Sequence, residues 1–157
     1  MTRLRGRAAR SQRVHGHAPQ GHWPVTTLLG ALRLDGSIAC LAMEGATDTE
    51  VFQTYVRQVL CPILRAGDIV VMDNLAPHKD PVSLSLIAQA GAEVLFLPAY
   101  SPDLNPIEKM WSKVKGLLRS AEARTQEALY EAISAALAKV TRQDAINWFA
   151  SCGYSFI

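Results

Sequence analysis

The sequence has few cysteines, no long apolar run and no internal repeat. The first two of these features exclude classes of protein. Cys40, Cys61 and Cys152 are scattered without CxxC spacing, which argues against a disulfide framework or a zinc site and favours a reducing compartment. No apolar run approaches the roughly 20 residues that span a bilayer, and the arginine-rich start lacks the apolar stretch of a signal peptide. The sequence therefore predicts a cytoplasmic protein with no membrane segment.

Acidic residues are missing from the sequence before Asp35, although the net charge of the whole chain is only +2. The arginines of this stretch are Arg3, Arg5, Arg7, Arg10, Arg13 and Arg33. A block of one charge sign is typical of a flexible, solvated arm, and in some proteins such an arm binds phosphates. We predict a basic, irregular arm over residues 1–24 and a single domain over residues 25–157.

The domain alternates strand-like and helix-like patterns. Apolar runs at 25–34 and 38–43 flank Asp35-Gly36 and predict a β-hairpin. Helical periodicity predicts helices at about 48–60, 81–90, 107–119 and 125–140. Short continuous apolar runs predict buried strands at 69–72 and 94–97. A proline-rich loop at 98–106 and a short tail with Trp148, Phe149 and Tyr154 complete the domain. This order predicts a mixed α/β sheet with helices on its faces.

Two acidic residues stand where ligands gather in such a sheet. Asp73 ends a buried strand, and ligands of open α/β sheets bind at the carboxyl ends of parallel strands. Glu108 opens a helix directly after the proline-rich loop. Each residue also has a structural interpretation, because Asp73-Asn74 can simply start a turn and Glu108 can close a capping box with Asn105. Both interpretations stay open for both residues.

Other polar side chains near these acids are candidates for supporting contacts. His78 follows Asp73 closely and is either a structural histidine or one that orients a water or contacts the backbone. Lys109 and Lys115 lie on the helix that carries Glu108, where they form a solvated face or bind phosphates.

The motif that these residues form together is more specific than any of them alone. It reads Asp73-Asn74-x-x-x-His78, then Leu97-Pro98-x-Tyr100-Ser101-Pro102-Asp103-Leu104-Asn105-Pro106-Ile107-Glu108-x-x-Trp111, then Lys115. From about Arg5 to Trp148 the chain resembles the catalytic core of the DDE transposases. Its motifs are most similar to those of the mariner-like superfamily, in the bacterial insertion-sequence branch.

This resemblance implies a ribonuclease-H-like fold and cut-and-paste transposition, in which DNA strands are cut and joined at the ends of an insertion element. It also implies three catalytic acids that hold two Mg²⁺ or Mn²⁺ ions, with Asp73 matching the second acid and Glu108 the third. Hard cations take oxygen ligands, and two of them about 4 Å apart can activate an attacking hydroxyl. The remaining candidates would contact metal ligands, phosphates or DNA: Asn74, His78, Lys109 and Lys115 around the acids, and Arg3, Arg5, Arg7, Arg10 and Arg13 in the arm.

The first acid of that family has no match in this sequence. In the family it lies on a central strand between the hairpin and the strand that ends at Asp73, and neither Asp35, Glu44 nor Asp48 is a convincing substitute. We therefore expect the C-terminal part of a transposase that lacks the first, central strand of its sheet, binds metal weakly or not at all, and is inactive alone. A decayed fragment, a misplaced start and the second half of a protein made from two reading frames are all consistent with this pattern.

Two other functions stay open at this point. A non-catalytic DNA-binding or assembly fragment would act with a missing N-terminal half, or with or against an intact transposase. It would bind DNA in a salt-dependent way without Mg²⁺, and in a bacterial cell it would be associated with the nucleoid. The third possibility is a small α/β protein with an ordinary binding cleft.

Overall fold

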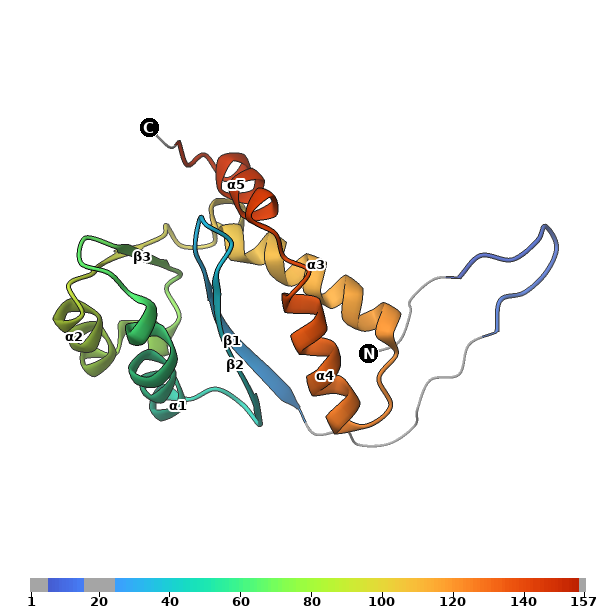
Figure 1. The fold of residues 1–157 in the computed structure, drawn as a ribbon, viewed down its shortest axis with the longest axis horizontal. Coiled ribbons are helices and arrows are strands. Elements are labelled where there is room, and N and C mark those ends of the chain that lie inside the picture. Colours follow the sequence, from blue (N-terminus) through green and yellow to red (C-terminus); the bar gives the residue numbers. More distant parts are fainter. Residues whose placement is uncertain (1–5, 16–24, 156–157) are drawn as a thin grey trace.

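The computed structural model describes residues 6–15 and 25–155 of the chain. Its strands are β1 (Thr26–Leu32), β2 (Ile38–Glu44), β3 (Ile69–Met72) and β4 (Glu93–Phe96). Its α-helices are α1 (Thr49–Tyr55), α2 (Pro81–Gln89), α3 (Pro106–Ala121), α4 (Gln126–Leu137) and α5 (Arg142–Ser151). Strands and helices together form the mixed α/β architecture that the sequence predicts (Figure 1). None of the helices in the described residues is long and apolar enough to cross a membrane.

The β1–β2 hairpin turns at Asp35-Gly36, as the sequence predicts. The Asp35 carboxylate accepts a hydrogen bond from the Ser37 amide at 2.9 Å, and Gly36 has a φ of +88° that glycine adopts without strain. A Cβ at position 36 would lie 2.8 Å from the Cα of Arg142, at the start of α5. Glycine is therefore required both by the turn and by the close approach of α5.

The helix expected at about 48–60 is built in three pieces. α1 begins after Asp48, whose side chain accepts from the Val51 amide at 2.8 Å. The chain continues as a π-helical turn over Val56–Leu60 and ends in a 3₁₀ turn over Cys61–Ile63, where Pro62 stops the α-helical pattern. All three pieces contribute residues to one apolar cluster, against which Leu29 and Ala31 of the hairpin pack.

The strands form two separate sheets within the described residues. β1 pairs with β2 in antiparallel fashion, and β3 pairs with β4 in parallel fashion. No pairing joins one sheet to the other in this part of the chain. As a result β1 and β3 are paired along one edge only.

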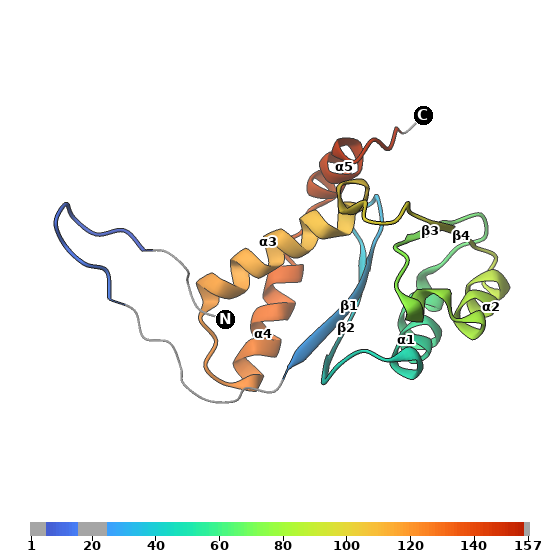
Figure 2. The same ribbon diagram turned by 180° about the vertical axis from the view of Figure 1, so that it is seen from behind.

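The hairpin lies between two apolar clusters, and it contributes to both (Figures 1 and 2). On one side Leu29 and Ala31 pack against a cluster formed mainly by α1, α2, β3 and β4. On the other side Leu28 and Leu32 pack against a cluster of α3 and α4. Gly30 lets α3 come close, because a Cβ there would lie 2.9 Å from the ring of Trp111.

One expectation about the C-terminal region was wrong. Residues 142–151, expected to be a short tail, form helix α5. The helix starts at Thr141, which forms a capping box with Asp144, and it is tied to α3 by an ion pair between Lys113 and Asp144. The Thr-x-x-Asp spacing is a helix-start signal, but few apolar residues follow it, so periodicity alone gave a weak pattern.

We expect Asp144 to make stability depend on pH. The Lys113 ammonium, together with the Thr141 amide and hydroxyl, holds the pKa of Asp144 at about 2. Because the pKa is lowered on folding, the stabilisation is present above about pH 4 and is lost as the pH falls towards 2. The variant Asp144→Asn should lose about 1 kcal/mol near neutral pH, the usual value of a helix cap, and should show a flatter acid branch in urea unfolding.

Glu131→Gln, on the exposed face of α4, is the matched control, and its pH dependence should follow that of the unaltered chain. An unchanged acid branch in Asp144→Asn would show that this pair does not contribute to acid stability.

Candidate active site

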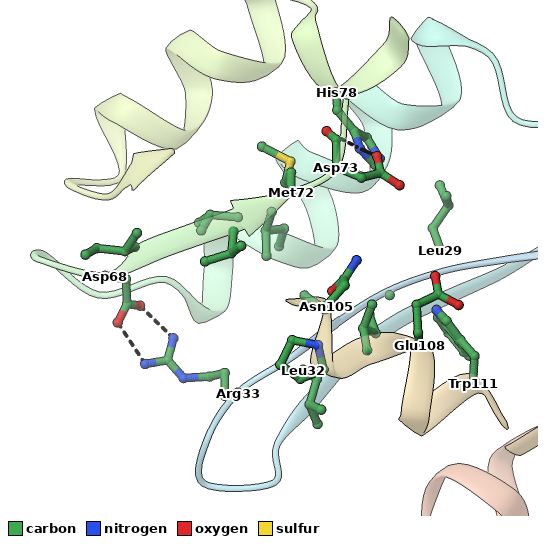
Figure 3. A pocket seen from close by; sticks show the side chains of 18 of the residues that line it. Leu29, Leu32, Arg33, Asp68, Met72, Asp73, His78, Asn105, Glu108 and Trp111 are labelled. Atoms are coloured by element: carbon green, nitrogen blue, oxygen red, sulfur yellow. Dashed lines mark hydrogen bonds and ion pairs between the residues drawn. The ribbon is translucent and has the colours of Figure 1, made fainter. Parts of the chain in front are cut away.

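A cavity of about 470 Å³ lies between β1, β3 and the first turns of α3 (Figure 3). Its apolar lining comes from both sheets and from α3. The two acids singled out in the sequence, Asp73 and Glu108, both line it. They lie on facing walls, Asp73 at the carboxyl end of β3 and Glu108 in the first turn of α3 (Figure 3). The fold thus brings to one cavity two residues that are far apart in the sequence.

Asp73 has both local partners and access to the cavity. One of its carboxylate oxygens accepts from the Leu75 amide at 3.1 Å, so the turn that follows β3 uses this side chain. The same oxygen lies 2.7 Å from Nδ1 of His78. The carboxylate is nearly half exposed and keeps a second oxygen for other ligands.

His78 contacts the acid that precedes it in the sequence. Its ring packs against Phe52 with 4.7 Å between the ring centroids, which fixes the imidazole beside the carboxylate of Asp73. His78 lines the cavity and is only 20% exposed. Its geometry is that of a residue that orients Asp73, and it reaches this place from the short 3₁₀ helix Ala76–Lys79.

Asn74 has a structural contact that the sequence did not predict. Its side-chain amide donates to the backbone carbonyl of Leu97, just beyond the end of β4. This hydrogen bond links the chain segments that leave β3 and β4. Asn74 therefore helps to fix the end of the β3–β4 sheet, next to Asp73.

The capping box considered for Glu108 does not form. Asn105 is the N-cap residue of α3, but its side chain makes no capping hydrogen bond, and the contact between the two residues is from the Glu108 amide to the Asn105 carbonyl at 3.1 Å. The Glu108 carboxylate is instead exposed and points into the cavity (Figure 3). The interpretation of Glu108 as part of a capping box with Asn105 is therefore wrong.

The two lysines named with Glu108 do not line this cavity. Lys109 is partly buried outside the lining, and Lys115 is exposed. Arg7, Arg10 and Arg13 of the arm are exposed in a segment with a turn and no helix or strand. Arg3 and Arg5 lie outside the described residues.

A pair of charged residues that sequence reasoning missed closes the other end of the cavity. Arg33, just after β1, donates to both carboxylate oxygens of Asp68, just before β3, at 2.6 and 2.9 Å (Figure 3). Arg33 lowers the pKa of Asp68, and the Arg65 amide bonds the same carboxylate. Hydrophobic patterns do not reveal such a pair, because its members are 35 positions apart.

Tyr100 belongs to the motif described above, but the sequence alone gave it no role of its own. It is fully exposed and has a φ of +58°, the left-handed region that a tyrosine rarely adopts. It lies in the loop between β4 and α3, upstream of Glu108. Residues held in such sparsely populated backbone conformations cluster at functional sites.

The two carboxylates at the cavity have the donor chemistry of an Mg²⁺ or Mn²⁺ site, since both cations take oxygen ligands. Two carboxylates are fewer than the three acids that hold two metal ions in a complete site of this kind. Within residues 6–15 and 25–155, no group of three His, Cys, Asp or Glu side chains is placed to hold a metal ion. The described residues therefore fit part of a two-metal site.

Comparison with known proteins gives the family of this chain. A family model described as DDE superfamily endonuclease matches residues 1–130, which is most of the chain. A search of curated proteins finds no match. The matched region includes both acids and the whole cavity wall from β1 to α3. Enzymes of this superfamily are nucleases of the transposase type that act on DNA and generally use divalent metal ions. By this match, the chain belongs to the DDE superfamily endonuclease family.

Proposed function

We propose that this chain carries two of the three acids of a transposase that cuts and joins DNA strands at the ends of an insertion element. The observation that carries the proposal is the presence of Asp73 and Glu108 on facing walls of one cavity. The mariner-like superfamily, in its bacterial branch, is the assignment that the motif of residues 97–111 favours.

In the proposed site each acid has its own mode of support. His78 and the turn after β3 hold Asp73, while the first turn of α3 presents Glu108. These carboxylates would hold the metal ions, which in a complete site activate an attacking hydroxyl and stabilise the leaving oxygen. We infer that the chain alone is inactive, because a third acid is needed to complete the ligand set.

The proposed partners follow from the presence of only two of the three acids in this chain. DNA is the substrate, and the third acid would come from another polypeptide segment, such as one of an intact transposase. A second candidate function is a non-catalytic fragment that binds DNA and assembles with, or interferes with, such a protein. The exposed arginines of the arm favour this function, and it requires no metal.

Binding of Mn²⁺ to the purified chain tests the metal-site proposal directly. We expect weak binding, measured by electron paramagnetic resonance, that decreases at least about tenfold in Asp73→Asn and in Glu108→Gln because each loses one charged oxygen ligand. Glu131→Gln removes a carboxylate far from the cavity and should leave the affinity unchanged. Equal affinities in all four proteins would contradict the assignment of both acids.

Tyr100 gives a further prediction on DNA binding. A base stacked on an exposed aromatic ring contributes roughly 1–3 kcal/mol, so Tyr100→Ala should weaken binding of single-stranded DNA about fivefold or more. Tyr100→Phe keeps the ring and should bind like the unaltered chain, as measured by fluorescence anisotropy. Because the ring is fully exposed, neither change should lower the midpoint of thermal unfolding. An alanine variant with unaltered affinity would exclude stacking.

A further inference from the structure

The first turn of α3 carries Glu108, yet it has little local support. Among the α-helices of the described residues, the others each begin at a residue whose side chain accepts a capping hydrogen bond. Asn105 at the start of α3 makes no such bond. The direction in which α3 leaves its loop, and with it the position of the Glu108 carboxylate, therefore depends on contacts from elsewhere in the chain.

Tyr154 supplies such a contact from a position 50 residues further along the sequence. Its hydroxyl donates to the backbone carbonyl of Leu104 at 3.0 Å, directly before the N-cap residue Asn105. Tyr154 also lines the cavity that contains Glu108. The phenol thus contacts the loop at the point where the loop turns into α3.

The end of α5 determines where the Tyr154 side chain points. Gly153 has a φ of +88°, and its amide donates to the Ala150 carbonyl at 3.0 Å. The Tyr154 amide donates to the Phe149 carbonyl at 3.1 Å. These two bonds around a left-handed glycine form a Schellman motif, and the apolar contact that accompanies the motif is present, with 5.5 Å between the ring centroids of Phe149 and Tyr154. The motif and the ring contact together fix the direction of the phenol.

Helix α5 is joined to α3 on both sides of Glu108. It lies beside the first half of α3 (Figures 1 and 2). In the first turn of α5, Asp144 pairs with Lys113, which follows Glu108 on α3, at 2.5 Å. After the end of α5, Tyr154 bonds Leu104, which precedes Glu108. The helix turn that presents Glu108 is therefore held from both ends by one neighbouring element.

We propose that Tyr154 is a positioning residue for the metal site, and that its hydrogen bond to the Leu104 carbonyl keeps the Glu108 carboxylate directed into the cavity. The inference rests on the proposed function, since it assigns Tyr154 a role at the same site. The family model ends at residue 130, so the Tyr154–Leu104 contact involves a part of the chain that the family match does not cover. The effect of Tyr154 on the site passes through Glu108.

Amide hydrogen exchange tests this contact without any metal. Tyr154→Phe removes the hydroxyl and keeps the ring. We expect the amides of Leu104, Asn105 and Glu108 to exchange about three- to tenfold faster, as the loss of one hydrogen bond implies. Tyr130→Phe removes a hydroxyl from α4, outside the cavity lining, and is the matched control that should leave these rates unchanged.

Binding of Mn²⁺ connects the contact to Glu108. Tyr154→Phe should lower the affinity of the purified chain for Mn²⁺ about three- to tenfold, measured by electron paramagnetic resonance. In a Glu108→Gln background the same change should have no further effect, because the carboxylate that Tyr154 positions is then absent. A residue that only stabilises the fold would lower the thermal midpoint and would reduce the affinity of both backgrounds alike.

Gly153→Ala tests the same contact through the backbone. A Cβ at this position meets no atom within 4 Å, so the substitution acts through the φ of +88°, which alanine adopts only with strain. It should redirect Tyr154 and change exchange and Mn²⁺ affinity in the same direction as Tyr154→Phe. If circular dichroism shows that Gly153→Ala does not fold, Tyr154→Phe decides the question.

Two results would overturn the inference while the proposed function stands. One is unchanged exchange at Leu104 and Glu108 in Tyr154→Phe. The other is a Mn²⁺ affinity that Tyr154→Phe leaves unaltered, or lowers equally in both backgrounds, although Glu108→Gln alone weakens binding. A Glu108→Gln variant that binds Mn²⁺ like the unaltered chain would instead reject the proposed site, and the positioning role of Tyr154 would be rejected with it.

Discussion

Replacing Asp73 by Asn, or Glu108 by Gln, is expected to reduce DNA strand transfer at least about 10³-fold in a complemented form of the protein. In that form the chain is joined to a segment that supplies the first strand and its acid. Each substitution keeps the shape of the side chain and removes its negative charge, so the loss reflects the missing ligand charge. The readout is joining of labelled element ends to a target plasmid in Mg²⁺.

The same assay separates a catalytic role from a structural one. Asp73 also accepts from the Leu75 amide and contacts His78, so the thermal midpoint of every variant must be measured beside its activity. Glu131→Gln serves as the control and should retain full activity. Strand transfer that survives in Asp73→Asn, in a folded protein, would reject the assignment of the second acid.

The arm is expected to control the salt dependence of DNA binding. Changing Arg7, Arg10 and Arg13 together to Gln should weaken binding to duplex DNA roughly 100-fold at low salt and reduce the slope of log affinity against log salt by up to about 2.7. The physical reason is that each arginine that contacts a phosphate releases a condensed counterion. Anisotropy titrations over a range of salt concentrations, without Mg²⁺, measure both quantities.

A matched charge change on the folded domain is the control for this experiment. Arg57, Arg65 and Lys139 are exposed in the domain, and their joint replacement by Gln changes the net charge by the same amount. If this control loses as much affinity and slope as the arm variant, binding depends on overall charge and the arm has no special role.

Much of the fold was predictable because local signals and apolar patterns agree with each other. Asp35-Gly36 between two apolar runs gave the hairpin, and the run 69–72 gave β3 with Asp73 at its end. Proline at the start of α3 marked where the helix begins, and it placed Glu108 in the first turn. Asp73 and Glu108 could be singled out as candidates because one directly follows a well-marked strand and the other lies in the first turn of a well-marked helix.

Other features depend on contacts that no local pattern encodes. The missing capping bond of Asn105 and the new hydrogen bond of Asn74 depend on where the cavity and the end of β4 lie. Helix α5 buries only Ala145 completely, so tertiary contacts such as the Lys113–Asp144 pair stabilise it more than its own periodicity. The positive φ of Tyr100 likewise follows from the path of its loop, which the sequence does not reveal.

The position of the hairpin between two apolar clusters has a consequence for unfolding. Leu29 and Ala31 on one face of β1, and Leu28 and Leu32 on the other, belong to different clusters but to the same strand. Melting of either cluster removes the support of this strand and exposes the other cluster to water. Residues 25–155 are thus expected to lose their structure as one cooperative unit, even though their core is divided in two.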